Sequence, residues 1–158
     1  MRLVKLSTNT FAEEDDLVAY FGEELPARNP PGLFMFRNRI AKDALNPGET
    51  VLFSYRGRLR FVAQAETGRL DNIYMPHPKY PHCFVINLRT LRRADVPLDE
   101  LENRLRTRGG LHTSLRGRAW TRISNSKSAE QVVTSFLVCD GPISAGRATN
   151  MVSCRHVS

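Results

Sequence analysis

Apolar and polar positions between Glu49 and Leu70 predict two strands joined by a tight turn. The string ETVLFSY is rich in β-branched and aromatic residues, and a second apolar run begins at Leu59. Arg56-Gly57-Arg58 separates the two runs and supplies a glycine that tolerates a positive φ. Asn46-Pro47-Gly48 is a further turn signal just before the first run. We therefore expect a β-hairpin at the centre of the fold.

The N-terminal part of the chain predicts a strand, a helix and a loop. The apolar positions of Arg2–Ser7 suit a short strand. Thr10 and Glu13 form a T-x-x-E capping box, which predicts a helix of about three turns ending at Gly22. Prolines recur between residues 23 and 31 and predict a loop there.

The later elements complete an α+β pattern. Short apolar stretches at 33–36 and 83–88 predict strands, and 40–45 suits a single helical turn. Pro97 opens a helix, and Ser126 or Ser128 can cap a last one. This order predicts a small curved or closed β-barrel with about three helices packed outside. We expect residues 1–140 to form one domain and 141–158 to form a poorly ordered polar tail.

Charge changes the picture from fold to partner. The 158 residues carry a net charge of +7, and the pI is about 9.8. Arginine dominates the basic residues, and its planar fork suits phosphate and base edges better than lysine does. A basic surface that only keeps the protein soluble is the alternative, but a polyanionic partner, most simply nucleic acid, is favoured.

Trp120 and a set of arginines with one asparagine are candidates for nucleic-acid contact. Trp120 lies within an arginine-rich stretch, although a lone tryptophan can equally belong to a core. Arg116, Arg118 and Arg122 are separated by even numbers of residues, so in an extended segment they would lie on one face. Taken singly, each arginine could simply be solvated. The candidate contacts are Arg37, Asn38, Arg39, Arg56, Arg58, Arg116, Arg118 and Arg122.

Other function classes find little support in the sequence. No apolar run has the roughly 20 residues that a membrane span needs, and MRLVKLSTNT is not a signal peptide, so we expect a cytoplasmic protein. The three cysteines match neither a zinc motif nor a disulfide framework. No P-loop, dinucleotide-binding glycine string or catalytic carboxylate pair is evident. We expect no metal, no cofactor and no catalytic residues in this chain.

Four strings resemble the PUA-like superfamily, in particular its EVE and YTH branches. The opening RLVKLSTNT resembles the first strand of those domains, and LNPGETVLFSYRGRLRFVAQAET resembles their central hairpin. FVINLRTLRRADVPLDEL resembles the strand and helix that follow, and GRAWTRISNSKSAEQVVTSFL resembles the closing segment. The resemblance implies a small β-barrel whose cleft accepts a nucleobase turned out of its strand, often a methylated base, within an aromatic cage.

Carried onto this chain, the resemblance implies a base pocket and a role. Ser7, Thr8 and Asn9 match the polar string that contributes to the pocket floor in relatives, although they could simply lead into a helix. Tyr74 falls in the irregular loop where YTH-like relatives place a cage residue; Tyr55 and Trp120 are the other cage candidates. Such domains often serve as readers of methylated DNA in modification-dependent restriction enzymes, beside a separate nuclease domain.

Three alternatives remain open at this point. An RNA-binding module on the same fold differs only in contacts to the sugar 2′-hydroxyl, although DNA is favoured here. A protein-interaction or antitoxin-like domain would use the basic face for an acidic partner. A small hydrolase would use the loop that contains His77 and His82.

Overall fold

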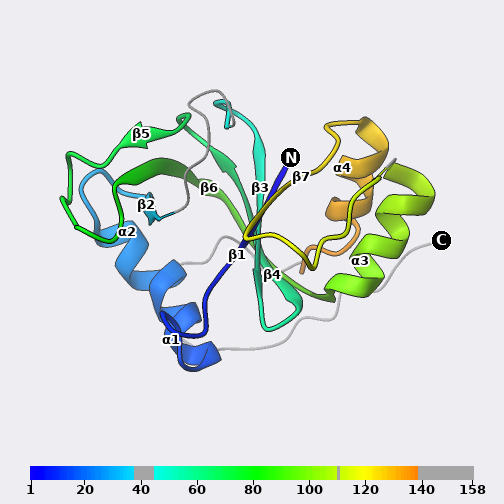
Figure 1. Cartoon of the computed structure of the whole chain (residues 1–158), viewed down its shortest axis with the longest axis horizontal. Coiled ribbons are helices and arrows are strands. Elements are labelled where there is room, and N and C mark those ends of the chain that lie inside the picture. Colours follow the sequence, from blue (N-terminus) through cyan, green and yellow to red (C-terminus); the bar gives the residue numbers. More distant parts are fainter. Residues whose placement is uncertain (38–44, 110, 139–158) are drawn as a thin grey trace.

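The computed structural model of the chain describes residues 1–37, 45–109 and 111–138. Within these ranges, seven strands form one sheet that curls around a buried layer (Figure 1). The strands are β1 (Arg2–Lys5), β2 (Leu33–Phe36), β3 (Thr50–Tyr55), β4 (Arg58–Ala65), β5 (Leu70–Asp71), β6 (His82–Pro97) and β7 (Trp120–Arg122).

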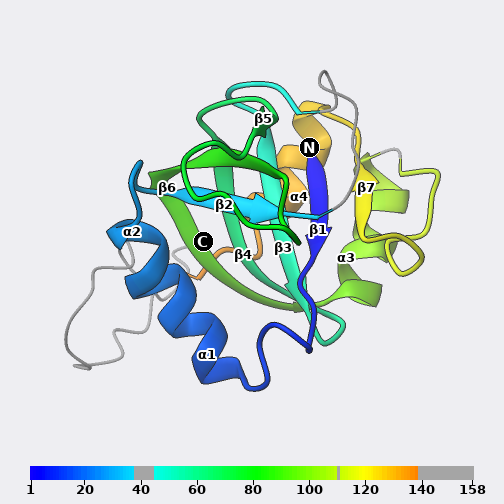
Figure 2. The same cartoon turned by 60° about the vertical axis from the view of Figure 1, so that its left-hand side comes forward.

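Three helical segments in the described ranges pack outside the sheet. The first contains α1 (Glu14–Ala19), a π-helical turn η1 (Tyr20–Glu24) and α2 (Leu25–Ala27). The second is α3 (Leu98–Arg104) followed by η3 (Leu105–Gly109), and the third is α4 (Lys127–Thr134). Figure 2 shows α1 and α2 on one side of the sheet and α3 and α4 on the other. None of these helices has both the length and the apolar character needed to cross a bilayer.

The sheet is mixed and strongly curved. Its strand order is β2-β6-β4-β3-β1-β7, with β5 paired to β6 outside this path. β1 runs parallel to β3, and the other pairings are antiparallel. Irregularities in the β4–β6 register occur between Leu59 and Phe61 and between Val62 and Gln64. Such bulges bend and twist a strand, which explains how β6 can pair with β2 at one end and with β4 at the other.

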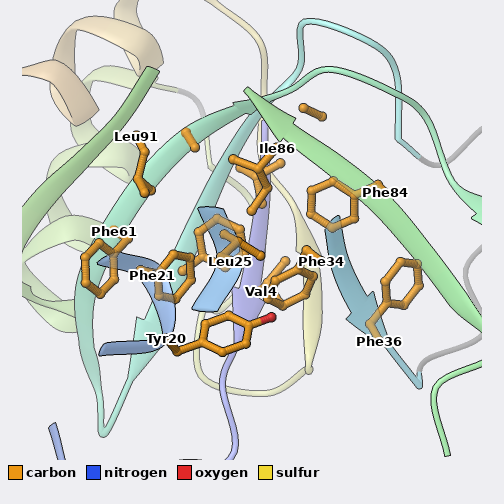
Figure 3. Packing of buried hydrophobic residues seen from close by; sticks show 14 of the residues in the cluster. Val4, Tyr20, Phe21, Leu25, Phe34, Phe36, Phe61, Phe84, Ile86 and Leu91 are labelled. Atoms are coloured by element: carbon orange, nitrogen blue, oxygen red, sulfur yellow. The ribbon is translucent and has the colours of Figure 1, made fainter. Parts of the chain in front are cut away.

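Consecutive residues of the central strands supply two different cores, because both faces of the sheet are covered. On β3, Phe53 packs with Phe21 and Phe34 on the α1 side, at ring-centroid distances of 5.0 and 5.2 Å. Its neighbour Leu52 belongs to the core under α3 and α4. Figure 3 shows the aromatic core, in which the rings of Phe21 and Phe61 stack at 4.3 Å.

The central hairpin and its turns are confirmed. Arg56 and Gly57 connect β3 to β4 with φ values of 48° and 75°, the pattern of a two-residue hairpin turn whose twist matches the strands. Gly48 has a φ of 81°, and the Glu49 amide donates to the Asn46 carbonyl oxygen at 3.0 Å. The turn before the hairpin is therefore formed as well.

The first helix begins later and continues further than expected. Its N-cap is Glu13, not Thr10, and the Asp16 carboxylate accepts the Glu13 amide at 2.9 Å. Thr10 lies instead in a turn, and its amide donates to the Ser7 carbonyl oxygen. The helical path then runs through Gly22 and Pro26, because buried Phe21 and Leu25 hold it against the sheet. The predicted loop therefore begins only after Ala27.

The later elements agree with the sequence in kind but not in length. β6 extends to Pro97, nine residues beyond the predicted end at Leu88, and directly precedes α3. The last helix has Ser126 as its N-cap, whose Oγ accepts the Ala129 amide at 3.1 Å. The predicted turn at 40–45 lies mostly outside the described residues, and the tail at 141–158 lies wholly outside them. The α+β class with a small curved sheet is confirmed.

Candidate functional site

A cleft opens where the two ends of the curled sheet approach each other. The rings of Phe36 on β2 and Trp120 on β7 lie 4.8 Å apart between centroids, although these are the first and last strands of the sheet path. The cleft has a volume of about 920 Å³ and is bordered by the end of β1, by β2, by β7 and by residues 78–81. A volume of this size falls in the range of small-molecule sites.

Aromatic side chains from five separate segments line the cleft. Trp120 is half-buried, and it also contacts Phe84 edge-on at 6.2 Å, so packing fixes its ring. Edge contacts with Phe11 at 5.1 Å and with Phe34 at 6.3 Å fix the ring of Tyr20. In Figure 3, Tyr20, Phe34 and Phe36 lie along one side of the buried cluster. The aromatic lining residues are Phe11, Tyr20, Phe34, Phe36, Tyr80 and Trp120.

Tyr20 and Arg28 form a polar pair on the cleft wall. Arg28 Nη1 donates to the Tyr20 hydroxyl at 3.0 Å and to the Leu33 carbonyl oxygen at 2.7 Å. Burial raises the pKa of Tyr20 to about 12, and the nearby Arg28 only partly offsets this effect. The phenol is therefore neutral at physiological pH. Since its oxygen already accepts from Arg28, its proton can be donated to a ligand.

Within residues 1–37, 45–109 and 111–138, the charged residues that line the cleft are all basic: Lys5, Arg28, Arg37 and Lys79. Lys5 Nζ donates to the Arg116 carbonyl oxygen, which holds the Ala119–Trp120 connection beside β1. Arg37 and Lys79 are exposed at the rim. A cleft with one sign of charge attracts an oppositely charged ligand and raises its local concentration. The basic residues of this cleft favour an anionic ligand.

A second pocket has a different character. It has a volume of about 270 Å³ and lies between the sheet and α4, where Gln64, Thr90 and Glu130 contribute polar groups. Its lining contains no aromatic side chain. Of these two pockets, the larger cleft alone combines aromatic walls with an exclusively basic set of charges.

No protein-family model, curated protein or solved structure matches this chain. The site is therefore interpreted from its own residues.

Four residues singled out from the sequence come together at the cleft. Ser7, Asn9, Arg37 and Trp120 all line it, from β7, from the end of β2 and from the turn that follows β1. The Ser7 hydroxyl accepts the Asn9 amide at 3.1 Å, which shapes this turn. Thr8 is exposed in the same turn but does not belong to the lining.

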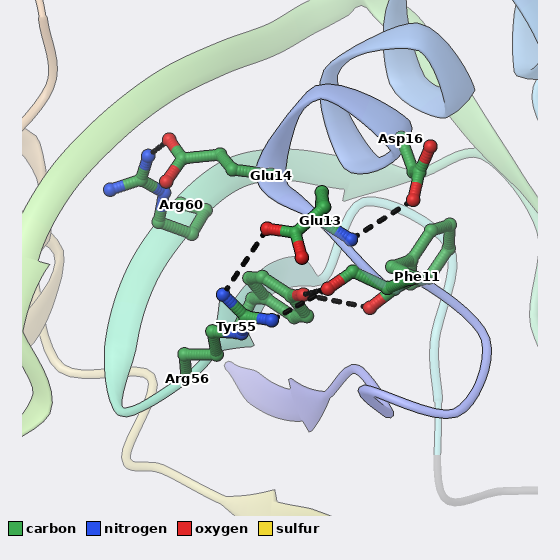
Figure 4. A network of polar contacts seen from close by, with 8 residues as sticks. Phe11, Glu13, Glu14, Asp16, Tyr55, Arg56 and Arg60 are labelled. Atoms are coloured by element: carbon green, nitrogen blue, oxygen red, sulfur yellow. Dashed lines mark hydrogen bonds and ion pairs between the residues drawn. The ribbon is translucent and has the colours of Figure 1, made fainter.

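The two tyrosines proposed as cage residues lie elsewhere. Tyr55 is buried in the core, and its hydroxyl donates to the Phe11 carbonyl oxygen at 2.7 Å (Figure 4). It therefore supports the Phe11 segment from behind and does not line the cleft. Tyr74 is exposed on the loop between β5 and β6, also outside the lining.

Several of the candidate arginines are held by acidic partners. Arg56 pairs with Glu13 at 3.6 Å and also donates to the Ala12 carbonyl oxygen (Figure 4). Arg58 and Arg60 share the Asp95 carboxylate, at 2.7 and 2.6 Å.

The remaining candidates are more dispersed than the sequence predicts. Arg116 pairs with Asp99 in the connection before β7, and Arg118 is exposed in the same connection. Of the three arginines around Trp120, only Arg122 lies in a strand, so these three do not form one extended row. Asn38 and Arg39 lie outside the described residues.

Sequence reasoning missed Tyr20, Arg28 and Tyr80. Tyr20 lies in the apolar stripe of the first helix, a pattern that predicts a core residue; it is buried, but it also lines the cleft. Arg28 follows the helix at a position with no periodic signal. The loop between β5 and β6 is rich in aromatic residues, which is a signal for Tyr80, but the family resemblance pointed to Tyr74 as the cage residue of this loop.

The histidine-containing loop does not assemble a group of residues that could hold a metal ion within the described residues. The His77 ring lies 4.8 Å from the Tyr80 ring, and His82 lies 5.8 Å from Phe36. Cys83 is buried, and burial raises the pKa of its thiol. A raised pKa disfavours the thiolate needed for nucleophilic attack.

Proposed function

We propose that this chain is a reader domain that binds nucleic acid and accepts one extruded base, a methylated base of DNA, in the cleft. One observation carries the proposal: six aromatic side chains and four basic residues line a single cleft of about 920 Å³, and no acidic residue from the described part of the chain joins them. The aromatic faces suit a base, and the basic residues suit the phosphates on either side of it.

The physics of the cleft supports base binding over binding of a general anion. Stacking of a base on an aromatic side chain is worth about 1–3 kcal/mol. Packing fixes both Trp120 and Tyr20, so little side-chain entropy is lost when a base enters. The neutral Tyr20 hydroxyl supplies a donor for a base acceptor, and the exposed Asn9 side chain offers both a donor and an acceptor.

The PUA-like assignment, with its EVE and YTH branches, belongs to the same proposal. Two observations support it: the sheet is small and curled, and the cleft lies at the end of β1, where the polar string Ser7–Asn9 was expected to contribute. In this proposal the domain supplies specificity to a restriction system in the cytoplasm. It has no catalytic activity of its own, and cleavage resides in a separate nuclease domain.

Fluorescence anisotropy with labelled duplexes tests the proposal. Plain, 6-methyladenine and 5-methylcytosine DNA are compared at two salt concentrations, beside RNA of matched sequence. We expect one methylated duplex to be preferred by about tenfold, which corresponds to about 1.4 kcal/mol. Equal binding to all duplexes would remove base reading, a preference for RNA would favour the RNA-binding alternative, and no binding would favour a protein partner.

Paired variants separate the cleft from the rest of the basic surface. Trp120→Leu keeps apolar contact with Phe36 but removes the aromatic face, so the methyl preference should fall to within twofold. Trp120→Phe keeps an aromatic face and should retain most of the preference. If both variants behave alike while both remain folded, stacking on Trp120 is not the basis of recognition.

The basic rim has a charge-matched control on the other face of the molecule. Arg37→Gln and Lys79→Gln each remove one cation from the cleft rim, and each should lower the slope of log K against log salt by about 1. Arg108→Gln removes an exposed cation from η3, under the opposite core, and should leave that slope unchanged. Equal effects of all three variants would indicate diffuse electrostatic binding without a preferred cleft.

A further inference from the structure

The loop between β5 and β6 presents three consecutive large apolar side chains to solvent. Ile73, Tyr74 and Met75 are 74%, 49% and 40% exposed. Among the described residues, Val138 at 38% is the only other large hydrophobic residue exposed to this degree. Single exposed apolar residues are ordinary, whereas a contiguous group marks a surface that contacts something. We call Ile73-Tyr74-Met75 the apolar tip.

Hydrogen bonds from one residue hold this loop in a defined shape. The buried Asn72 side chain donates through Nδ2 to the carbonyl oxygens of Met75 at 2.7 Å and Tyr80 at 2.9 Å. Its Oδ1 accepts the Met75 amide at 3.1 Å, and its backbone amide donates to the Pro81 carbonyl oxygen at 2.9 Å. Asn72 thus closes the base of the apolar tip and ties it to the second half of the loop.

The second half of the same loop is the rim of the cleft. Residues 78–81 line the cleft, and the His77 ring packs on the Tyr80 ring at 4.8 Å. The Tyr80 amide donates to the His77 carbonyl oxygen at 3.0 Å. The apolar tip and the cleft rim are therefore two parts of one preorganised unit. Figure 2 shows this loop close to β2, which supplies another wall of the cleft.

We propose that the apolar tip is a wedge that enters the base stack of a DNA duplex and occupies the space left by the base extruded into the cleft. This inference rests on the proposed function and adds the element that opens the duplex. Isoleucine and methionine side chains are among the apolar wedges that unstack base steps, and a tyrosine ring can stack on the bases that remain. A fixed loop loses little entropy on insertion.

Charge around the apolar tip fits the same partner. Residues 72–81 include Lys79 and contain no acidic residue. The flanking Asp71 lies 3.5 Å from Arg69, which offsets its charge. Loops that carry apolar tips can also insert into membranes, but here the tip adjoins a cleft sized and lined for a planar aromatic ligand. The observations favour a duplex.

The test compares substrates that need opening with substrates that do not. Three DNAs carry the same methylated base: a duplex, a duplex with an abasic site opposite the target, and the single strand. The double variant Ile73→Ser/Met75→Ser should lose at least tenfold affinity for the intact duplex. It should lose no more than about twofold for the other two, because neither has a paired base to extrude. Val138→Ser, which removes an exposed apolar residue away from the cleft, should change none of them.

A second readout reports on opening itself. With 2-aminopurine beside the target base, wild-type binding should raise fluorescence as stacking is lost, and the double variant at saturating concentration should give less than half of that rise. Equal losses on all three DNAs, or an unchanged affinity for the intact duplex, would overturn the wedge. So would binding to phosphatidylserine vesicles that the double variant abolishes while duplex binding is unchanged.

Failure of the wedge can be distinguished from failure of the proposed function. If wild-type protein prefers the methylated duplex and loses that preference with Trp120→Leu, the reading cleft stands whatever the double variant does. If wild-type protein binds only single strands, or binds no nucleic acid, both proposals fall. A duplex opened by wild-type protein and by the double variant alike would remove the wedge alone.

Discussion

Replacing Gly32 by alanine should destabilise the protein more than the same change at Gly48 or Gly57, which also have a positive φ. Gly32 connects the end of α2 to β2 with a φ of +85°, and an added Cβ would lie 2.3 Å from the Ile86 carbonyl oxygen. The residue cannot move aside, because its amide donates to the Leu25 carbonyl oxygen at 2.9 Å and its carbonyl oxygen accepts the Ile86 amide at 2.8 Å. Both partners belong to the buried core.

The expected loss of stability has two contributions, and only one of them applies at the other two glycines. Gly48 and Gly57 have φ values of +81° and +75°, and nothing lies within 4 Å of an added Cβ. Alanine at either position meets only the cost of the left-handed conformation, about 1–2 kcal/mol. At Gly32 the same cost is joined by overpacking against backbone, about 1–3 kcal/mol. We therefore expect a total of about 2–5 kcal/mol for Gly32→Ala.

Urea unfolding with linear extrapolation measures all three variants on one scale. Gly32→Ala should lose at least about 1 kcal/mol more unfolding free energy than Gly48→Ala or Gly57→Ala, because that is the lower end of the overpacking cost. Because β2 supplies Phe34 and Phe36 to the cleft, Gly32→Ala should also weaken duplex binding where Gly57→Ala does not. A Gly32→Ala variant as stable as the two controls would refute the argument from the close approach to Ile86.

Three further predictions concern ionisable groups. Glu49→Gln should cost about 3 kcal/mol in urea unfolding, because the buried carboxylate lies 3.5 Å from the Met1 ammonium group and 3.8 Å from Arg2 Nε, and both cations would lose this negative charge. Hydrogen bonding from Arg58 holds the pKa of Asp95 below its usual 3.8. The stability that this interaction contributes is present above pH 3.8 and is lost as pH falls through the folded-state pKa. Asp95→Asn should therefore flatten the acid limb of a curve of unfolding free energy against pH. Burial raises the pKa of Tyr20 to about 12 from 10.0. Stability in urea unfolding should therefore fall as pH rises from about 10 to 12, and Tyr20→Phe should remove this loss.

Local signals in the sequence predicted the elements that local interactions form. The Arg56-Gly57 turn and the Ser126 cap each involve residues within a few positions of one another, and both are confirmed. The N-cap predicted for the first helix was wrong, because the pattern that starts at Thr10 overlaps with the one that starts at Glu13. Thr10 and Glu13 fit a capping box, but Tyr55 and Arg56 donate to the carbonyl oxygens of residues 11 and 12, which holds the chain before Glu13 in a non-helical path.

Elements fixed by distant contacts could not be predicted in the same way. The helix passes through Gly22 and Pro26 because Phe21 stacks on Phe61, far along the chain, and local propensity carries no trace of that contact. β6 continues through Arg92 and Arg93, although two consecutive arginines break the alternation of apolar and polar residues expected of a strand. It does so because β4 supplies a pairing edge there. In both cases tertiary packing overrides a local preference against the observed structure.

The cleft itself was predictable only in part, for the same reason. Trp120, Ser7 and Asn9 carry a signal in their composition and line the cleft, whereas Thr8 of the same string does not. Tyr55 has equal aromatic character and belongs to the same core cluster as Phe36, but its hydroxyl is satisfied by Phe11 and it does not line the cleft. Telling a cage tyrosine from a core tyrosine therefore requires knowledge of where along this face the curled sheet is open.

That open face is a consequence of how the sheet ends. β2 and β7 stand at opposite ends of the strand path, and among the described residues they meet through the Phe36 and Trp120 rings instead of a backbone ladder. A backbone ladder would close the sheet at a strand spacing of about 4.8 Å and leave no room for a ligand between the strands. A junction made by side chains can be widened or narrowed by substitution without breaking a hydrogen-bonded pair. The fold therefore places its aromatic cleft at a junction of the described sheet where sequence can change while the strand pairing is kept.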